Sequence, residues 1–290
     1  MKYKKNILIF IIAGFIIAYA SFSFAQSLPI ESGLLYIRAT QASEGYWGDI
    51  SEIPYNSFVD TCTVAETLKY LNETGASYPS AMQWINVTEV SNSDYLITKM
   101  IVLAQAGLDV LTMRDYLLNV KNDDGGWGVT GGLESDVKRT ALALQAHEAV
   151  NYADQTVING GIAYLLSNQN SDGGVGFYPG DESNVYMTAL FSYTLQQFSR
   201  TTSIATANNK ATTYLIAHQN INGGFGEGGM NPAPTSTIFE TSLAYMALVG
   251  VITDNTVLGN AITYLTSNQS SDGSWLQDPY STAWTKPVDS

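Results

Sequence analysis

The hydrophobic and polar positions of the chain recur at a fixed interval in its C-terminal half. The segments YLLSNQNSDGGVGF, YLIAHQNINGGFGE and YLTSNQSSDGSW begin at Tyr164, Tyr214 and Tyr264. In each segment an aromatic and an aliphatic residue begin a short apolar run, which is followed by a polar turn that contains glycine. A turn that recurs behind the same apolar run indicates a repeating structural unit.

Less regular copies extend the pattern to six repeats. Further copies start at Tyr36 and Tyr116, and a degenerate copy at Trp84 lacks the glycine turn. The repeats are therefore predicted to begin near residues 33, 81, 113, 161, 211 and 261. The positions that define the pattern are Gln41, Gly45, Trp47, Gly125, Trp127, Gln169, Gly173, Gln219, Gly223, Gln269, Gly273 and Trp275.

Each repeat is predicted to contain two helices of different character. In the first helix, residues such as Ile158, Ile162 and Leu165 form one apolar stripe, and the glycine turn ends the helix. The second helix is apolar or small nearly all round, which is typical of a helix buried on every side. Second helices are expected near 57–72, 94–107, 135–150, 183–198 and 236–250. Alternation of the two types predicts two concentric layers of helices, an all-α, α6/α6 toroid.

The sixth second helix is incomplete in this pattern. It would begin at Tyr280 and is interrupted at Pro287. Either the chain is a truncated form of a longer protein or the ring closes imperfectly. We favour truncation, because an unclosed ring would expose an apolar edge.

The motif aromatic-Leu-x3-Gln-x3-Gly-x-Trp resembles the QW repeat of squalene and oxidosqualene cyclases. The same repeat family includes the β subunits of protein prenyltransferases. The resemblance extends from about Gly33 to Trp275 and implies an α/α toroid with a central cavity. It also implies that the repeat glutamines tie each turn to its aromatic partner and to the next repeat. These roles are structural, and a fold does not by itself imply a function.

The N-terminus resembles a cleaved secretion signal. Lys4 and Lys5 precede an apolar run from Ile7 to Ala20, and small residues end at Ala25. The run is shorter than a membrane-spanning helix requires. We therefore expect a signal peptide at 1–25 and one toroid domain at 26–290, secreted, periplasmic or on the cell surface. No stable membrane anchor is expected after cleavage.

Charge and cysteine content exclude several classes of partner and fold. The formal net charge is −13 at pH 7, and it becomes more negative if the signal lysines are removed. A strongly acidic protein repels phosphate backbones, so nucleic acid is not an expected partner. The single cysteine, Cys62, excludes an internal disulfide framework.

The catalytic residues that the resemblance implies are missing from the sequence. Squalene-type cyclases carry their acid in an Asp-x-Asp-Asp motif, and no acidic cluster here has that spacing. Prenyltransferases bind zinc through Asp-x-Cys and a histidine. Asp60 and Cys62 match the first half, but a zinc site needs at least three protein ligands. The corresponding positions of the other second helices hold Arg139, Met187, Glu240 and Ser281, with Ile97 on the degenerate repeat, and none is histidine.

No metal or cofactor is therefore expected. A turn with Asn168, Asn170 and Asp172 resembles the start of a calcium-binding loop, but Pro179 stands where the loop's glutamate would be. A plain Asn/Asp-Gly turn explains these residues better.

The function indicated is binding of a hydrophobic or amphipathic small molecule in the cavity, or of a protein at the rim. Residues near the starts of the second helices would line one mouth of the cavity. Two alternatives stay open: a diverged enzyme, and a scaffold module of a larger surface protein. The enzyme would be an isoprenoid cyclase or transferase, or an α/α-barrel glycan-active protein with paired carboxylates. The candidate ligand-binding residues are Asp60, Asp136, Tyr186, Phe239 and Glu240.

Overall fold

The computed structural model describes residues 28–48, 54–73, 75–226 and 236–275. These residues form helices and isolated backbone bridges, and no strand occurs among them. None of the helices in this described part is long and apolar enough to span a membrane. The proposed signal peptide and the sixth second helix both lie outside the described residues.

First and second helices alternate in the order expected over the described part of the chain, up to the first helix of the sixth repeat. The first helices are α2 (Leu28–Thr40), α4 (Ser77–Val87), α6 (Leu111–Asn119), α8 (Gln155–Ser167), α10 (Thr202–Ala217) and α12 (Asn255–Ser267). The second helices are α3 (Pro54–Tyr70), α5 (Ser93–Gln105), α7 (Val137–Ala149), α9 (Val185–Leu195) and α11 (Ile238–Leu248). All five second helices were predicted, and their ends differ from the expected ranges by no more than three residues.

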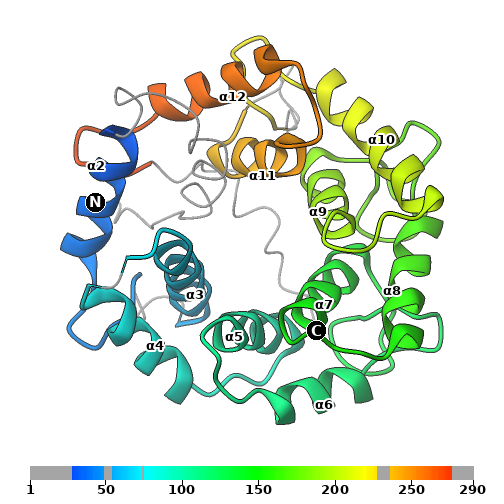
Figure 1. Cartoon of the computed structure of the whole chain (residues 1–290), viewed down its shortest axis with the longest axis horizontal. Coiled ribbons are helices and arrows are strands. Elements are labelled where there is room, and N and C mark those ends of the chain that lie inside the picture. Colours follow the sequence, from blue (N-terminus) through cyan, green and yellow to red (C-terminus); the bar gives the residue numbers. More distant parts are fainter. Residues whose placement is uncertain (1–27, 49–53, 74, 227–235, 276–290) are drawn as a thin grey trace. The chain divides into compact units, whose positions relative to one another are not determined.

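The chain divides into two compact units, residues 82–217 and residues 1–81 together with 218–290. In the 82–217 unit, α7 contacts α5 on one side and α9 on the other, so these second helices form one layer. Helices α6, α8 and α10 contact this layer and cover its outer side (Figure 1). The assignment of 26–290 to a single domain stays a prediction.

The other unit joins the two ends of the described chain. Helix α11 packs against α12, and the turn that follows α12 reaches the first turn of α2. Gly273 in that turn has a φ of +86°, which favours glycine. A Cβ atom at Gly273 would lie 2.0 Å from the carbonyl oxygen of Ser32, so the close approach of the two segments also requires glycine.

The repeat glutamines act as double hydrogen-bond donors. Each amide nitrogen donates to the glycine carbonyl of its own turn and to a carbonyl of the next first helix. The distances lie between 2.8 and 3.0 Å, and the second acceptors of Gln41, Gln169, Gln219 and Gln269 are Ser77, Ala207, Val257 and Pro29.

The repeat tryptophans use a partner other than the glutamines. Each indole nitrogen donates to a backbone carbonyl ten residues earlier in the chain. The three pairs are Trp47 with Ile37, Trp127 with Leu117, and Trp275 with Leu265. Each indole thus joins the turn to the first helix of its own repeat, and the tie between glutamine and aromatic side chain that the family resemblance implied stays a prediction.

Candidate functional site

A recurring threonine fixes the register of the second helices. The backbone N–H of the last turn residue donates to a threonine hydroxyl one turn into the next helix. The donors are Trp47, Trp127, Val175 and Phe225, and the acceptors are Thr61, Thr140, Thr188 and Thr241. Since each threonine follows the aligned position by one residue, Asp60, Arg139, Met187 and Glu240 are indeed equivalent.

The equivalent residue of the degenerate repeat differs from the one predicted. Asn92 caps α5 and accepts the N–H of Tyr95 at 3.1 Å, just as Asp136 accepts the N–H of Arg139 at 2.8 Å in α7. Tyr95 therefore corresponds to Arg139, and the prediction of Ile97 was wrong by two residues. Without a glycine turn, the sequence of this repeat offered no fixed point for the alignment.

One side of each second helix is less buried than the rest. Every residue of α9 is buried except Tyr186 and Tyr193, and every residue of α11 except Phe239 and Met246. Residues seven apart lie on the same side of a helix. These exceptions therefore mark a partly exposed side of each otherwise buried helix.

The same two positions are partly exposed in the neighbouring helices of the 82–217 unit. They lie two and nine residues after the capping residue of each helix. We call the resulting surface the inner face, because it is opposite the layer of first helices. Its residues are Asp94, Ile101, Lys138, Gln145, Tyr186 and Tyr193.

The candidate residues near the helix starts fall into two groups. Tyr186 lies on the inner face, and Phe239 occupies the equivalent position of α11. Asp136 and Glu240 are only 0% and 5% exposed, so both carboxylates are directed into the protein. Both also serve helix ends: Asp136 caps α7, and Glu240 exchanges hydrogen bonds of 2.9 Å with the capping residue Thr237.

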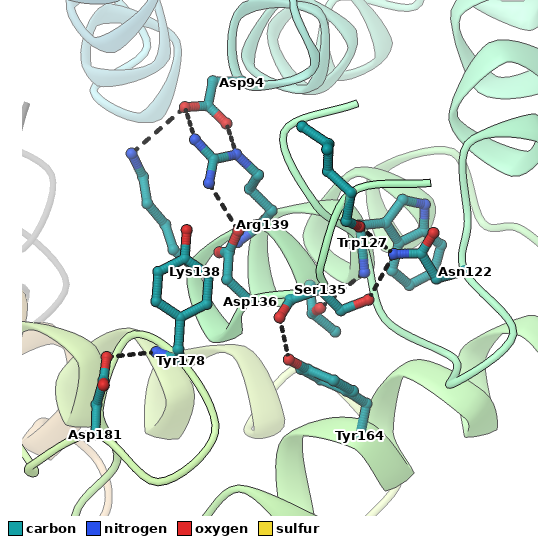
Figure 2. A network of polar contacts seen from close by, with 12 residues as sticks. Asp94, Asn122, Trp127, Ser135, Asp136, Lys138, Arg139, Tyr164, Tyr178 and Asp181 are labelled. Atoms are coloured by element: carbon teal, nitrogen blue, oxygen red, sulfur yellow. Dashed lines mark hydrogen bonds and ion pairs between the residues drawn. The ribbon is translucent and has the colours of Figure 1, made fainter. Parts of the chain in front are cut away.

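Four charged groups meet at the N-terminal end of the inner face (Figure 2). The guanidinium of Arg139 pairs with both oxygens of Asp94, at 2.8 Å from Nε to Oδ1 and 3.1 Å from Nη2 to Oδ2. Its Nη1 donates to Oδ2 of Asp136 at 2.7 Å. Lys138 lies further away, with its ammonium 3.7 Å from Oδ2 of Asp94. Two carboxylates and two cations give the group a formal charge of zero.

The surroundings change the pKa values of these groups. Burial raises the pKa of Asp136, although the charge and hydrogen bonds of Arg139 oppose the change. Burial lowers the pKa of Lys138, but the neighbouring Tyr186 and Asp94 outweigh it, so that the pKa is raised overall. Lys138 therefore keeps its proton at neutral pH. The ring of Phe177 lies 5.9 Å from the guanidinium carbon of Arg139, within the range of a cation–π contact.

The other unit holds the partial zinc motif. Asp60 is partly buried on α3, and burial raises its pKa to about 7. Cys62 is fully buried on the same helix. In the described part of the chain, no three His, Cys, Asp or Glu residues are grouped so that they could hold a metal ion. The motif thus has no third ligand there. Asp60 is nevertheless distinguished by its raised pKa.

The acidic turns have a structural explanation in the same hydrogen-bond pattern. Oδ1 of Asp172 accepts the N–H of Gly174 at 3.0 Å and the hydroxyl of Ser183 at 2.8 Å. It therefore shapes the turn and joins it to the start of the next second helix. Asp124 and Asn222 have the same role in their repeats.

A histidine near the C-terminal end of α7 is fully buried. His147 is 0% exposed, and neither ring nitrogen has a hydrogen-bond partner among the described residues. Its ring lies 4.9 Å from that of Tyr152 and 5.7 Å from that of Trp127. Burial lowers its pKa to about 4, and the charge of Arg114 contributes.

Comparison with known proteins gives the family. Residues 133–287, more than half of the chain, match the squalene-hopene cyclase C-terminal domain. The chain belongs to the squalene-hopene cyclase C-terminal domain family. Residues 55–188 also match the prenyltransferase alpha-alpha toroid domain. The predicted α/α toroid fold class and the family resemblance are thereby confirmed. No curated protein sequence matches the chain.

Solved structures agree with the squalene-hopene cyclase family at the level of fold. Candida albicans protein geranylgeranyltransferase-I, complexed with GGPP, is similar at 15% identity with a TM-score of 0.59. The match covers 83% of this chain and 82% of that chain. The ent-copalyl diphosphate synthase of Streptomyces platensis is similar at 13% identity with a TM-score of 0.54. That match covers 90% of this chain and 51% of the synthase.

Most residues of the inner face of this squalene-hopene cyclase-like chain were not identified from the sequence. Arg139 was identified from the sequence only as a position aligned with Asp60, and Asp94 was not identified as a candidate. Their pairing spans 45 residues, so no local spacing could indicate it. The helix register could have identified the inner-face residues, because the residue two positions after each capping residue is partly exposed.

Proposed function

We propose that the protein is an exported, non-catalytic member of its family that binds an amphipathic or largely apolar small molecule against the inner face. The observation that supports this most is the composition of that face. Tyr186, Tyr193 and Ile101 offer aromatic and apolar surface, and the other three residues of the face supply polar groups beside it. Binding sites for small molecules are commonly apolar surfaces with a small number of placed polar groups.

Internal pairing argues against phosphate chemistry at this face. Transfer or ionisation of a prenyl diphosphate needs cations that are free to hold the diphosphate. Arg139 already binds Asp94 and Asp136, each at 3.1 Å or less. Asp136, with 0% exposure, has no access to a substrate that it could protonate. Binding without reaction is therefore the better-supported role.

A binding experiment with one variant and one control tests this proposal. The probe is a linear C20 isoprenoid carrying a photoreactive diazirine group, cross-linked to the purified chain and mapped by peptide mass spectrometry. We expect labelled peptides from α5, α7 and α9. Tyr193→Ala should reduce labelling about tenfold, because loss of a buried aromatic contact costs about 1–2 kcal/mol.

The control for that variant is Leu111→Ala on α6, where the side chain is 53% exposed. It should leave labelling unchanged, and circular dichroism should show that both variants stay folded. Labelling spread evenly over the first helices, or equal labelling of Tyr193→Ala and wild type, would contradict the proposal. Native mass spectrometry of protein from its own host would identify a natural ligand, and a co-purifying protein instead would favour the rim-binding or scaffold reading.

One observation supports a second function, that of a diverged isoprenoid cyclase. Protonation of an alkene needs a carboxyl group that keeps its proton, and the pKa of Asp60 is raised to about 7 by burial. The test is incubation of the protein with squalene and with geranylgeranyl diphosphate, followed by gas chromatography of the extract. A cyclic product that disappears in Asp60→Asn would establish this function and overturn the non-catalytic proposal. The glycan-active alternative is less well supported, because the carboxylate of Glu240 is engaged with Thr237.

A further inference from the structure

We propose that Lys138 anchors the polar end of the ligand and that the inner face selects a neutral hydrogen-bond acceptor, a hydroxyl or carbonyl oxygen, over a phosphate or carboxylate. This inference rests on the proposed binding function and specifies the chemical class of its ligand. The supporting observation is that Arg139 has close carboxylate partners, whereas Lys138, which lies on the inner face, does not.

The two cations differ in how far their donors are used. Arg139 makes short contacts to two carboxylates. Among the described residues, the ammonium of Lys138 pairs with one carboxylate, at 3.7 Å, which is longer than a hydrogen bond. Of that neighbour, Asp94, Oδ2 already accepts from Arg139, and Oδ1 lies 2.8 Å from its Nε. The three N–H donors of Lys138 are thus poorly satisfied, and its side chain is 25% exposed at the inner face.

The ligand that satisfies these donors is constrained by charge. Asp94, Asp136, Lys138 and Arg139 already cancel in formal charge, so an added anion would bring an uncompensated negative charge next to Asp94. In a partly desolvated site that charge is costly. A hydroxyl or carbonyl oxygen accepts from the ammonium without adding charge. Repulsion from the acidic chain, with its net charge of −13, acts in the same direction.

The aromatic neighbours place the rest of such a ligand. The hydroxyl of Tyr186 is close enough to Lys138 to raise the pKa of its ammonium, and both side chains belong to the inner face. Tyr193 follows seven residues later on the same side of α9. A molecule with its polar end at Lys138 could therefore lie along both tyrosines toward Ile101 and Gln145.

Three probes that share one apolar chain test the selectivity. They are the linear C20 isoprenoid alcohol, its monophosphate, and the hydrocarbon without a polar end. Dissociation constants are measured by native mass spectrometry and by quenching of intrinsic fluorescence at constant ionic strength. For the wild type we expect the alcohol to bind at least tenfold more tightly than either the monophosphate or the hydrocarbon.

Variants of Lys138 assign this preference to one side chain. Lys138→Met keeps the length of the side chain and removes the donors, and we expect it to weaken alcohol binding about tenfold and to equalise alcohol and hydrocarbon. The matched control is Lys210→Met, at an exposed position of α10 in the same unit, which should change nothing. Thermal melting curves confirm that each variant folds.

The outcomes separate the two proposals. Tighter binding of the monophosphate than of the alcohol overturns the selection of a neutral acceptor. Equal binding of alcohol and hydrocarbon, or unchanged alcohol binding in Lys138→Met, overturns the role of Lys138 while the inner face keeps its function. If none of the three probes binds the wild type, the proposed function fails and this inference fails with it.

Discussion

The side-chain amide of Gln269 donates a hydrogen bond of 2.8 Å to the carbonyl oxygen of Pro29, 240 residues earlier in the chain. Every other repeat glutamine reaches the first helix of the repeat that follows it. Gln269 makes the same bond to α2, the first of the described helices, instead. The turn after α12 thus contacts α2 in the way that the other turns contact the first helix of the next repeat.

Loss of this bond should loosen α2 in particular. Gln269→Ala removes the donor for two carbonyls, of Pro29 and Gly273, and should lower the free energy of unfolding by about 1–2 kcal/mol. Hydrogen exchange should then show reduced protection of α2. Gln219→Ala removes an equivalent pair of bonds and serves as control, with protection lost in α12 first. Equal exchange in α2 for wild type and Gln269→Ala would refute the role assigned to this contact.

The third repeat lacks the glutamine, and restoring it should stabilise the protein. Lys121 occupies the glutamine position, and its ammonium bonds to the carbonyl of Asn122 at 3.1 Å. Elsewhere the glutamine's acceptor lies three residues before the carbonyl that approaches the turn glycine. In this repeat Gly125 approaches the carbonyl of Gly160, which points to the carbonyl of Val157 as the acceptor.

Lys121→Gln should therefore form hydrogen bonds to the carbonyls of Gly125 and Val157. We expect the free energy of unfolding to rise by about 1 kcal/mol, a typical net value for such bonds. Urea denaturation provides the measurement. Lys121→Met controls for the removal of charge and should not stabilise the protein. A glutamine variant no more stable than the methionine variant would mean that the register of this repeat differs from the others.

His147 and Asp60 should change the free energy of unfolding in opposite directions as the pH is lowered. The pKa of His147 is lowered from 6.5 to about 4, so the unfolded chain binds its proton more readily. The free energy of unfolding therefore falls as pH drops from 6.5 to 4, by about 3 kcal/mol in total. The pKa of Asp60 is raised from 3.8 to about 7, so the folded protein holds the proton. Its contribution to stability increases as pH drops from 7 to 3.8.

Single variants should reveal each slope separately. Asp60→Asn removes the compensating group, and its stability should fall more steeply than that of the wild type between pH 6.5 and 4.5. His147→Leu should instead become more stable over the same interval. Urea unfolding at five pH values measures both slopes. Parallel pH profiles for the wild type and the two variants would show that neither group titrates as its burial requires.

Much of the fold could be predicted because it depends on sequence patterns within single repeats. Glycine turns and apolar periodicity lie within single repeats, so six starts and five second helices could be located from the sequence. The degenerate repeat shows the limit: without its glycine turn, Ile97 was aligned where Tyr95 belongs. The error arose because apolar periodicity alone does not fix the register of a buried helix.

The candidate site was harder to predict because capping and lining residues share the same stretch of sequence. An aspartate at a helix start can cap the helix or face a ligand, and Asp136 does the former. The lining positions, such as Lys138, come two residues later and carry no common residue type. The network also depends on Asp94, which lies on a different helix, and such pairing has no local signature.

The pair Asp136 and Arg139 makes the strongest mutational prediction in the 82–217 unit. Arg139→Met should be severely destabilising, by about 3–5 kcal/mol, because it leaves the carboxylate of Asp136 fully buried without its cation. Asp136→Asn alone should cost little. Asparagine can still cap the helix, and Arg139 keeps its pairing with Asp94.

The neighbouring helix predicts how the double variant will behave. In α9 the same two positions are Asn184 and Met187, and Oδ1 of Asn184 accepts the N–H of Met187 at 2.8 Å. Asp136→Asn combined with Arg139→Met gives α7 the neutral arrangement that α9 already has. We therefore expect the double variant to be more stable than Arg139→Met alone, within about 1–2 kcal/mol of the wild type, by urea denaturation. If the costs of the two substitutions were additive, Arg139 would instead stabilise the protein through its pairing with Asp94, and not by compensating the buried charge of Asp136.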